Sequence, residues 1–529
     1  MKSKRISDQL SSMDFEQFAA DFSIADGRWA FGITGSGTSL ELMDALERSG
    51  VALVTPGHEA TAALMAGAYG RLTGKPALAV GIKGPGFMNL LPGLLSNAFE
   101  GYPSLSISES YPAEYAGSRC HKWLDHRRAG QEFLKRHRFF ESEAGYLGAC
   151  WSMARQEFPG PVHIELATGT EHSEDVQAAQ TGTVSTELKR TVERAERPLL
   201  IVGSLGLRAE WGALLPELTI PIFTTAAAKG LVDESGPFAA GVFTGAGKAP
   251  TPERTLLEET DLLITLGVRG GELLDTRLET SVALHIDTIP VSQDRLFPAR
   301  PLDAPTLVLS DAAIRCLVGV LREKSWGLDL LGECRQRLDD TIAGYPWSMV
   351  HAIRATQSAL PEAVHVLDTG NFTVLAEHFL KAATPASVLG TPNGRYMGAG
   401  LGYSLGASIA RPDAPVVLWV GDGGLRSSIG ELALAADHRC KLLVMAVKDG
   451  YFGSVRATAM ANGLTQTPVT LSDRSLVAIA EAMGLDSGTV ADESELDTAL
   501  GEWRRDPKPA LLECVINPDE YVEQAARVR

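Results

Sequence analysis

The stretch that decides the fold reads Val416-Val417-Leu418-Trp419-Val420-Gly421-Asp422-Gly423-Gly424. An unbroken apolar run that ends in glycines and a carboxylate predicts a buried strand followed by a tight turn. A helical pattern over 428–437 and a second apolar run over 441–447 come next. Strand, helix and strand in this order predict a βαβ unit with parallel strands.

Two carboxylates are expected at one edge of this sheet. Asp422 ends the first strand, and Asp449 follows the second strand. Open parallel sheets bind ligands at the carboxyl ends of their strands. The glycines after Asp422 let the backbone approach a phosphate, and two carboxylates, a backbone carbonyl and phosphate oxygens suit Mg²⁺. The pattern therefore indicates a magnesium and phosphate site, and the alternative is a turn in which Asp422 only caps a helix.

The same alternation of strands and helices extends along the chain in both directions. The expected strands are 51–55, 77–81, 104–108 and 161–166, then 197–203, 220–224, 261–267, 282–286 and 306–309, then 365–368, 415–420, 441–447 and 510–515. Polar segments at 167–187 and 324–347 read as linkers. The fold class is α/β, with three open, mostly parallel α/β domains over 1–180, 190–325 and 345–529. The first and third blocks alternate alike, which is typical of a remote internal duplication.

Composition excludes several classes of protein. The chain has 529 residues, 45% of them hydrophobic, so it is globular rather than disordered. Its 48 Lys+Arg against 65 Asp+Glu give a net charge of −17, which disfavours nucleic acid and membrane surfaces as partners. Six dispersed cysteines form no C-x-x-C pair, and no apolar run approaches the ~18 residues of a membrane span. A cytoplasmic protein is predicted.

The Gly-Asp-Gly turn and the downstream carboxylate resemble the signature of the thiamine diphosphate (ThDP) enzymes of the acetolactate synthase and 2-oxoacid decarboxylase superfamily. The resemblance covers nearly the whole chain, in the family's order of pyrimidine-binding, central and diphosphate-binding domains. It implies that Gly421, Gly423 and Gly424 bind the cofactor, and that Asp422, Asp449 and Tyr451 bind both the cofactor and the metal, Tyr451 through its carbonyl. Asp449 departs from the family, which usually has Asn there.

Two further stretches of the third block support the resemblance. The segment 365–371 is similar to the family's strand and diphosphate-contacting turn, which implies that Gly370 and Asn371 bind the cofactor. In the segment 393–402, Met397 stands where the family places the bulky apolar residue that props ThDP in a bent shape. A helix is expected over 397–410, in which a methionine could equally be plain core.

The first block holds the strongest single candidate for catalysis. The stretch Thr55-Pro56-Gly57-His58-Glu59 and the Ala-rich segment after it resemble the family's His-Glu segment. That resemblance implies that Glu59 hydrogen-bonds the aminopyrimidine ring and promotes its imino tautomer. The alternative is a surface carboxylate in a first helical turn. In the family this Glu comes from a different subunit than the metal site, which implies a homodimer or homotetramer with active sites at the interface.

Residues on the substrate side depart from the family. Lys83 precedes a Gly-Pro-Gly turn at a position where acetolactate synthases carry a small residue, and Glu109 replaces their usual Gln. The segment 119–128 is rich in His, Lys and Arg, and related enzymes bring this loop to the substrate. Lys83 and His121 are therefore candidate catalytic residues, with His126 the alternative proton carrier. The competing interpretation is a solvated basic loop.

Gly-rich turns at 203–206 and 267–271 stand in the central block, where some relatives hold FAD or ADP. A scaffold role is favoured over FAD, because an isolated Gly-x-x-Gly is a weak signal.

The sequence thus predicts a ThDP- and Mg²⁺-dependent enzyme that acts on a small 2-oxoacid by decarboxylation, by carboligation to a carbonyl acceptor, or by both. One alternative is a ThDP lyase or hydrolase that cleaves a carbon–carbon bond without decarboxylation. A non-catalytic ThDP-binding relative is the other.

Overall fold

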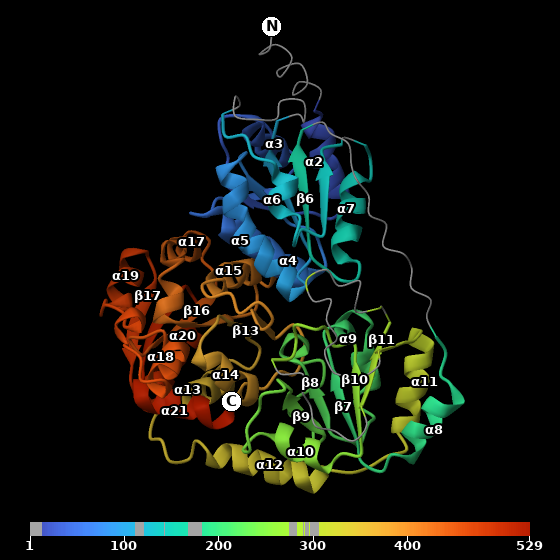
Figure 1. Cartoon of the computed structure of the whole chain (residues 1–529). Coiled ribbons are helices and arrows are strands. Elements are labelled where there is room, and N and C mark those ends of the chain that lie inside the picture. Colours follow the sequence, from blue (N-terminus) through green and yellow to red (C-terminus); the bar gives the residue numbers. More distant parts are fainter. Residues whose placement is uncertain are drawn as a thin grey trace.

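The structure is a computed structural model that describes residues 13–111, 121–141, 143–167, 182–274, 283–288, 290, 296 and 306–529. It folds into three lobes, each built on a six-stranded sheet (Figure 1). All strand pairs in the three sheets are parallel. The expected class, three open parallel α/β domains, is confirmed. The predicted linker at 167–187 lies largely outside the described residues.

The first domain has the strand order β2-β1-β3-β4-β6-β5. Its strands are β1 (Trp29–Gly32), β2 (Ala52–Val54), β3 (Leu78–Gly81), β4 (Ser104–Glu109), β5 (Arg136–Phe139) and β6 (Pro161–Leu166). Its helices are α2 (Phe15–Ile24), α3 (Thr38–Arg48), α4 (Glu59–Thr73), α5 (Pro85–Glu100), α6 (His126–Gly130) and α7 (Tyr146–Arg155).

The third domain repeats that order as β14-β13-β15-β16-β18-β17. Its strands are β13 (Val364–Leu367), β14 (Val388–Gly390), β15 (Val416–Gly421), β16 (Leu442–Lys448), β17 (Asp486–Val490) and β18 (Ala510–Val515). Its helices are α13 (Met349–Ala359), α14 (Asn371–Phe379), α15 (Gly400–Ala410), α16 (Asp422–Leu425), α17 (Leu432–Asp437), α18 (Gly453–Ala461), α19 (Leu476–Ala482), α20 (Glu493–Arg505) and α21 (Pro518–Val528), with short 3₁₀ turns η5 (Ile429–Glu431) and η6 (Thr467–Val469). The shared strand order supports the internal duplication.

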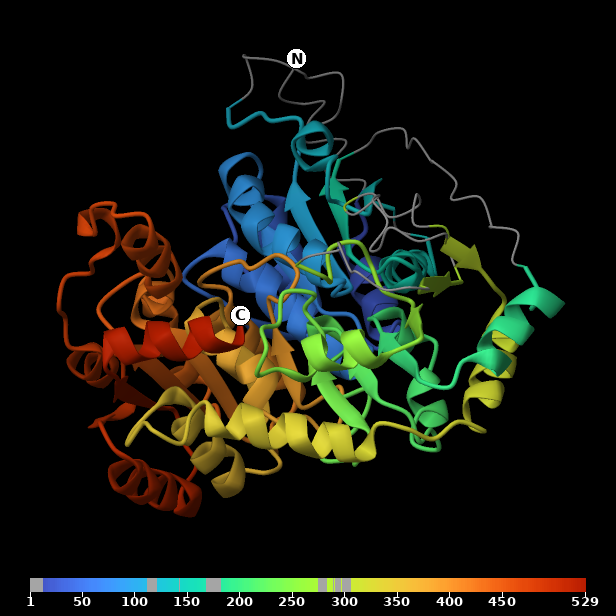
Figure 2. The same ribbon diagram turned by 60° about the horizontal axis from the view of Figure 1, so that its bottom comes forward.

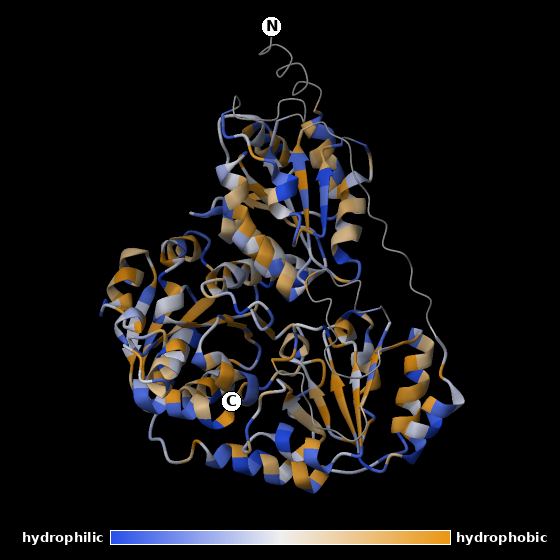
Figure 3. Ribbon diagram, in the orientation of Figure 1, coloured by the Kyte–Doolittle hydropathy of each residue, from blue (hydrophilic) through white to orange (hydrophobic). Residues whose placement is uncertain are grey.

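The central domain has the order β12-β11-β10-β7-β8-β9, a doubly wound sheet whose switch point lies between β7 and β10. Its strands are β7 (Pro198–Val202), β8 (Ile222–Thr224), β9 (Ala239–Val242), β10 (Leu262–Leu266), β11 (Ala283–Asp287) and β12 (Thr306–Val308). Its helices are α8 (Thr186–Arg194), α9 (Leu205–Arg208), α10 (Pro252–Glu259), α11 (Asp311–Leu321) and α12 (Leu328–Asp340), with 3₁₀ turns η2 (Trp211–Leu214) and η3 (Ala226–Ala228). Its strands are the most uniformly apolar in view, while the outer faces of the helices are polar (Figure 3).

One apolar core joins the first domain to the third. Alternate residues of β15 face opposite sides, so that Val416, Leu418 and Val420 belong to the core shared with α4 and α15, and Trp419 belongs to a second core beneath α13 and α14. Helices α4 and α15 pack against each other between the two domains (Figure 1). The third sheet, and the residues at its carboxyl edge, are therefore fixed relative to the first domain.

The structure differs from the expected elements in three ways. The segment 324–347, expected as a linker, contains α12, because Leu331, Cys334 and Leu338 repeat at helical spacing and are buried. This helix runs along the outside of the molecule (Figures 1 and 2). Helix α15 starts at Gly400 and not at Met397, because Gly398 has a φ of +90°. Five strands were not expected: β1, β5, β9, β14 and β17.

Within the described residues, no helix is both long enough and apolar enough to cross a bilayer.

Candidate functional site

A cavity of about 140 Å³ lies at the carboxyl edge of the third sheet, where the sequence predicted a metal and phosphate site. Every residue that lines it belongs to the third domain. Eight of the predicted site residues line it: Gly370, Asn371, Met397, Gly421, Gly423, Gly424, Asp449 and Tyr451. The ends of β13, β15 and β16 bring them together, as their positions after the strands require.

Asp422 and Asp449 form the acidic pair of this site. Asp422 accepts hydrogen bonds from Gly423 N at 2.9 Å and from Gly450 N at 3.2 Å, so its carboxylate lies against the turn that follows Asp449. Burial raises the pKa of both carboxyl groups, and the charge of Asp422 helps to raise that of Asp449 to about 6. The site is short of positive charge, which a divalent cation would supply.

The donors around the pair fit a metal-bound phosphate group. Asn371 is buried at the N-terminus of α14, its Oδ1 accepts from Ser454, and its Nδ2 has no hydrogen-bond partner. A Cβ at Gly453 would lie 2.9 Å from that Nδ2 and 2.7 Å from Asp449 Oδ2, so only glycine leaves this space open. Among the described residues, no three His, Cys, Asp or Glu side chains gather as a metal site.

Met397 lies on a loop over this cavity. Its side chain is 41% exposed, and its Cγ lies 3.5 Å from a Cβ placed at Gly424. Asp368, which is fully buried, accepts hydrogen bonds from Gly398 N at 2.9 Å and from Gly400 N at 3.1 Å. This carboxylate fixes the loop, a role that the sequence analysis did not assign to it.

Glu59 stands in the first domain at the first residue of α4 and is 6% exposed, so it is not a surface carboxylate. Asn89 Nδ2 donates to its Oε2 at 2.9 Å, and a Cβ at Gly86 would lie 3.2 Å from its Oε1. The turn before it is held by the third domain, since Glu431 accepts from Gly57 N at 2.9 Å and from Thr61 Oγ1 at 3.0 Å. Glu59 does not line the cavity of Asp449.

Lys83 and Glu109 pair with each other. Lys83 Nζ donates to Glu109 Oε2 at 2.5 Å, with the lysine side chain 25% exposed and the glutamate almost fully buried. Ser39, in the first turn of α3, donates to Glu109 Oε1 from its amide at 3.0 Å and from its hydroxyl at 2.6 Å. Although burial raises the pKa of Glu109, these donors outweigh it and leave the pKa below its usual value. Lys83 and Glu109, which both depart from the family pattern, thus form one ion pair.

The two histidines proposed as proton carriers lie in different environments. His121 is exposed beside the undescribed residues 112–120, and its carbonyl accepts from Tyr111 at 3.0 Å. His126 is buried, and its Nε2 accepts from Gly84 N at 3.2 Å, so a neutral ring donates from Nδ1 to Ser108 at 3.1 Å. Burial lowers the pKa of His126 to about 4. Burial and the engagement of both ring nitrogens disfavour His126 as a proton carrier, and in the structure His126 holds the Gly84 turn.

The hydrogen bonds of His126 continue into the sheet. Ser108 Oγ lies 3.0 Å from His163 Nε2, and His163 Nδ1 lies 2.8 Å from Ser106 Oγ. The sequence analysis missed His163, because its partners stand on a neighbouring strand. Its place inside the expected strand 161–166 was the one available signal.

In the central domain, a side chain fills the predicted nucleotide turn. Glu272 accepts hydrogen bonds from Ser204 N at 3.1 Å and from Thr225 Oγ1 at 2.9 Å. A Cβ at Gly203 would lie 2.3 Å from Gly267 O, so the turns after β7 and β10 are in direct contact. A carboxylate thus occupies the place after the first strand where a doubly wound sheet binds a pyrophosphate.

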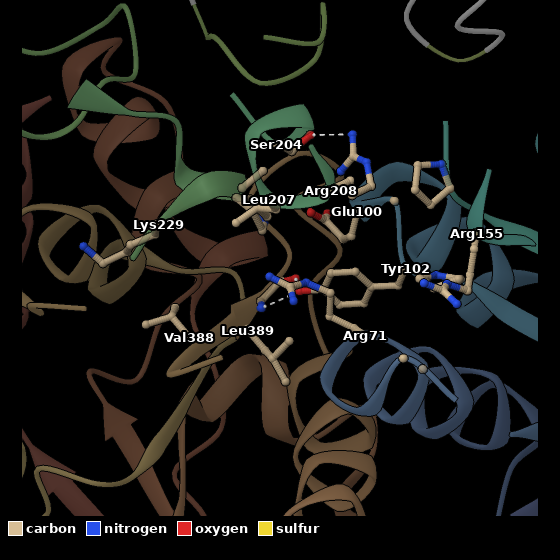
Figure 4. Close-up of a pocket in the computed structure, with 18 of the residues that line it drawn as sticks. Arg71, Glu100, Tyr102, Arg155, Ser204, Leu207, Arg208, Lys229, Val388 and Leu389 are labelled. Carbon is tan, nitrogen blue, oxygen red and sulfur yellow. Dashed lines mark hydrogen bonds between the residues drawn. The ribbon is translucent and has the colours of Figure 1, made fainter. Parts of the chain in front are cut away.

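A second cavity, of about 690 Å³, lies where the three domains meet (Figure 4). Its walls include Arg71, Glu100 and Tyr102 from the first domain, Arg208 from the central domain and Leu389 from the third. Neither Asp422 nor Asp449 lines it, so it is distinct from the acidic pair.

Comparison with known proteins places the same three domains on the chain. Residues 26–134, 186–302 and 368–514 match the N-terminal TPP binding domain, the central domain and the C-terminal TPP binding domain of the thiamine pyrophosphate enzymes, where thiamine pyrophosphate is a synonym of ThDP. The chain is 24% identical to a probable acetolactate synthase large subunit of Methanococcus aeolicus, over 92% of this chain and 89% of that protein. It is also 24% identical to the acetolactate synthase isozyme 2 large subunit of Escherichia coli, over 93% of each chain.

Proposed function

Because the chain belongs to the ThDP enzymes of the acetolactate synthase family, we propose that it is a ThDP- and Mg²⁺-dependent enzyme that acts on a 2-oxoacid by decarboxylation, by carboligation, or by both. The observation that carries the proposal is the acidic pair of Asp422 and Asp449 beside the unpartnered amide of Asn371. These groups suit a magnesium diphosphate, which proteins hold through one or two carboxylates on the cation and through donors to the phosphate.

Each of the predicted site residues in the third domain would help to hold the cofactor. Asp422, Asp449 and the carbonyl of Tyr451 would bind Mg²⁺, while Asn371 and the amides at the N-terminus of α14 would bind the diphosphate. Gly370, Gly421, Gly423 and Gly424 keep the backbone close to it. Met397 would support the cofactor between its two rings. When bound, ThDP supplies an electron sink for the carbon that loses or forms a bond.

Glu59 would hold and move the proton at the aminopyrimidine ring. Its buried position keeps water away from the carboxyl group, and Asn89 orients one oxygen while leaving Oε1 free to meet the ring. Gly86 preserves the space in front of Oε1, since a side chain there would collide with it.

The substrate side of the site comes from the same domain edge as Glu59. Lys83 offers further N–H donors while Glu109 neutralises its charge and fixes its direction, an arrangement suited to the carboxylate or carbonyl oxygen of a 2-oxoacid. His121 would act as a proton carrier. Its segment lies against the Gly84 turn, since Lys122 O lies 2.4 Å from a Cβ placed at Gly84.

The proposal includes a homodimer or homotetramer. The acidic cavity is lined by the third domain alone, and Glu59 belongs to the first domain. We propose that the first domain of a second chain completes the site, as the resemblance to the family implies. Bound FAD is not part of the proposal, since Glu272 would repel a pyrophosphate at the turn after β7.

A non-decarboxylating lyase or hydrolase would use the same cofactor residues. The two reactions would differ in what the substrate-side residues Lys83, Glu109 and His121 do. The first experiment therefore separates the cofactor from the substrate. ThDP binding is measured by calorimetry with and without Mg²⁺, and the loaded protein is then followed by NMR with pyruvate, alone and with an aldehyde acceptor.

We expect Mg²⁺-dependent ThDP binding and consumption of the 2-oxoacid. Glu59→Gln should bind ThDP with wild-type affinity while turnover falls by about 10²–10⁴-fold, the range for loss of a general acid–base group. Failure of the wild type to bind ThDP would refute the proposal, and unchanged turnover in Glu59→Gln would refute the role of Glu59. Binding without decarboxylation would favour the lyase or hydrolase.

A further inference from the structure

The loop that presents Met397 has an unusual backbone. Arg395 has a φ of +48° and Gly398 has a φ of +90°. A left-handed conformation costs about 1–2 kcal/mol for a residue with a side chain, so the surroundings of Arg395 must hold the loop in this shape.

Three buried carboxylates hold it. Asp368 binds the amides of Gly398 and Gly400, and Glu377 pairs with Arg395 at 2.7 Å. Glu100 accepts from Gly394 N at 2.8 Å through Oε1 and from Asn393 N at 3.2 Å through Oε2. Two of the three come from the third domain itself.

Glu100 is the exception, because it belongs to the first domain. It is the last residue of α5, whose first turn contains Gly86 in front of Glu59. Asn393 Nδ2 also donates to Phe99 O at 3.1 Å, and a Cβ at Gly394 would lie 3.0 Å from the Phe99 side chain. The end of α5 is thus fitted closely to the start of the Met397 loop.

We propose that Glu100 is a positioning residue for the cofactor site: from the first domain, its carboxylate fixes the backbone of the loop that presents Met397. This inference rests on the proposed function, in which Met397 supports the cofactor. It adds a contact within one chain between the loop and the helix that starts beside Glu59.

The electrostatic environment of Glu100 makes this contact sensitive to pH. Burial raises the pKa of Glu100 to about 8, against the opposing effect of the two amides, Arg395 and Arg269. The charge of Glu100 also acts on Tyr102 and Tyr403, and Arg71 lies beside Tyr102 (Figure 4). Below this pKa one oxygen carries a proton and faces the Asn393 amide as a donor, so one of the two bonds is lost.

Glutamine imitates the protonated form, since its carbonyl accepts one bond and its NH₂ group cannot accept the other. The test compares wild type, Glu100→Gln and a matched control, Glu253→Gln. Glu253 is equally buried and accepts amide hydrogen bonds from Thr244, Gly245 and Gly247, but it holds a loop of the central domain.

Two measurements are made on the full-length protein. Hydrogen–deuterium exchange of the 391–400 peptide reports the loop without any ligand, and calorimetry with ThDP and Mg²⁺ reports the cofactor site. Both measurements are compared at a pH above 8, where wild-type Glu100 is ionised. There we expect faster exchange in Glu100→Gln alone, and about tenfold weaker ThDP binding, the effect of losing one hydrogen bond to a charged group. The difference from wild type should grow as the pH rises through 8, where wild-type Glu100 becomes ionised.

Wild-type exchange and wild-type ThDP affinity in Glu100→Gln would overturn this inference and leave the proposed function standing. Absence of ThDP binding by the wild type would overturn both. If Glu100→Gln does not fold, Glu100→Asp replaces it: the shorter acid keeps the charge but not the reach, so the same two changes are expected, and their absence would equally overturn the inference.

Discussion

Asp449 stands where the family usually has asparagine, and it adds a second carboxylate to the site of Asp422. Its carboxylate and that of Asp422 share one site, and each has a pKa raised by burial. Two buried like charges repel each other until a cation neutralises them. If the site binds Mg²⁺ as proposed, the extra charge at 449 makes ThDP binding more dependent on the metal than an asparagine would.

Asp449→Asn should restore the common family residue. Because the amide oxygen can still ligate Mg²⁺ and the like-charge repulsion is gone, we expect activity to survive and ThDP affinity, at saturating Mg²⁺, to equal that of the wild type or exceed it. Asp449→Ala should weaken Mg²⁺-dependent ThDP binding by about tenfold or more. Calorimetric titrations of both variants check this, and an indifferent Asp449→Ala would show that this side chain is not a ligand.

Sequence reasoning succeeded for residues that follow a strand and failed for residues whose partner is remote. Asn371 and Asp449 line one cavity, and Asp422 binds the Gly450 amide beside it, because parallel strands end at one edge. The pairing of Lys83 with Glu109, and that of Glu100 with Asn393, depend on side chains brought together only by tertiary packing. No local pattern identifies such partners.

Among the elements, every interior strand except β1 was predictable, whereas the edge strands β5, β9, β14 and β17 were not. Apolar runs such as β15 and β16 are buried on both faces, which gives a clear signal. The edge strands β5 and β17 are polar, short and only partly buried, so they read as loops. The sequence also did not show which helices pack against each other, although the Ala- and Gly-rich composition of α4 and α15 is apparent in it.

The contact between α4 and α15 depends on glycine. A Cβ at Gly406 would lie 2.5 Å from Met65 O, and one at Gly402 would lie 2.8 Å from the Leu64 side chain. Backbone cannot yield as a flexible side chain can, so Gly406 sets how closely the first and third domains approach.

Gly406→Ala should lower the free energy of unfolding by about 1–3 kcal/mol, the usual cost of overpacking a core. Gly501→Ala is the control: this glycine lies in α20 with nothing within 4 Å of its Cβ position, and the change should raise the free energy of unfolding by about 0.5–1 kcal/mol. Urea unfolding of the two variants gives the comparison. Equal stability of both would mean that the helices can separate without cost.

At the scale of the whole molecule, the division of the site between two domains makes the assembly testable. If each active site takes Glu59 from one chain and Asp422 from another, neither Glu59→Gln nor Asp422→Ala homodimers should turn over. A mixed dimer would regain one intact site.

Unfolding and refolding the two inactive variants together should therefore restore activity, to about half of the wild-type rate per mixed dimer if the two sites act independently. Each variant refolded alone is the control, and sedimentation confirms that dimers form. No recovery in the mixture, with dimers present, would place both residues in the same chain's site.

The repeated strand order of the first and third domains gives the α4–α15 contact another meaning. Helix α4 follows the second strand of its domain, and α15 follows the second strand of the other. Equivalent helices thus face each other inside one chain, as they do across the twofold axis of a symmetric pair. The polypeptide has the form of a fused ancestral dimer whose halves have diverged, one keeping a carboxylate at the start of the helix and the other a methionine-bearing loop.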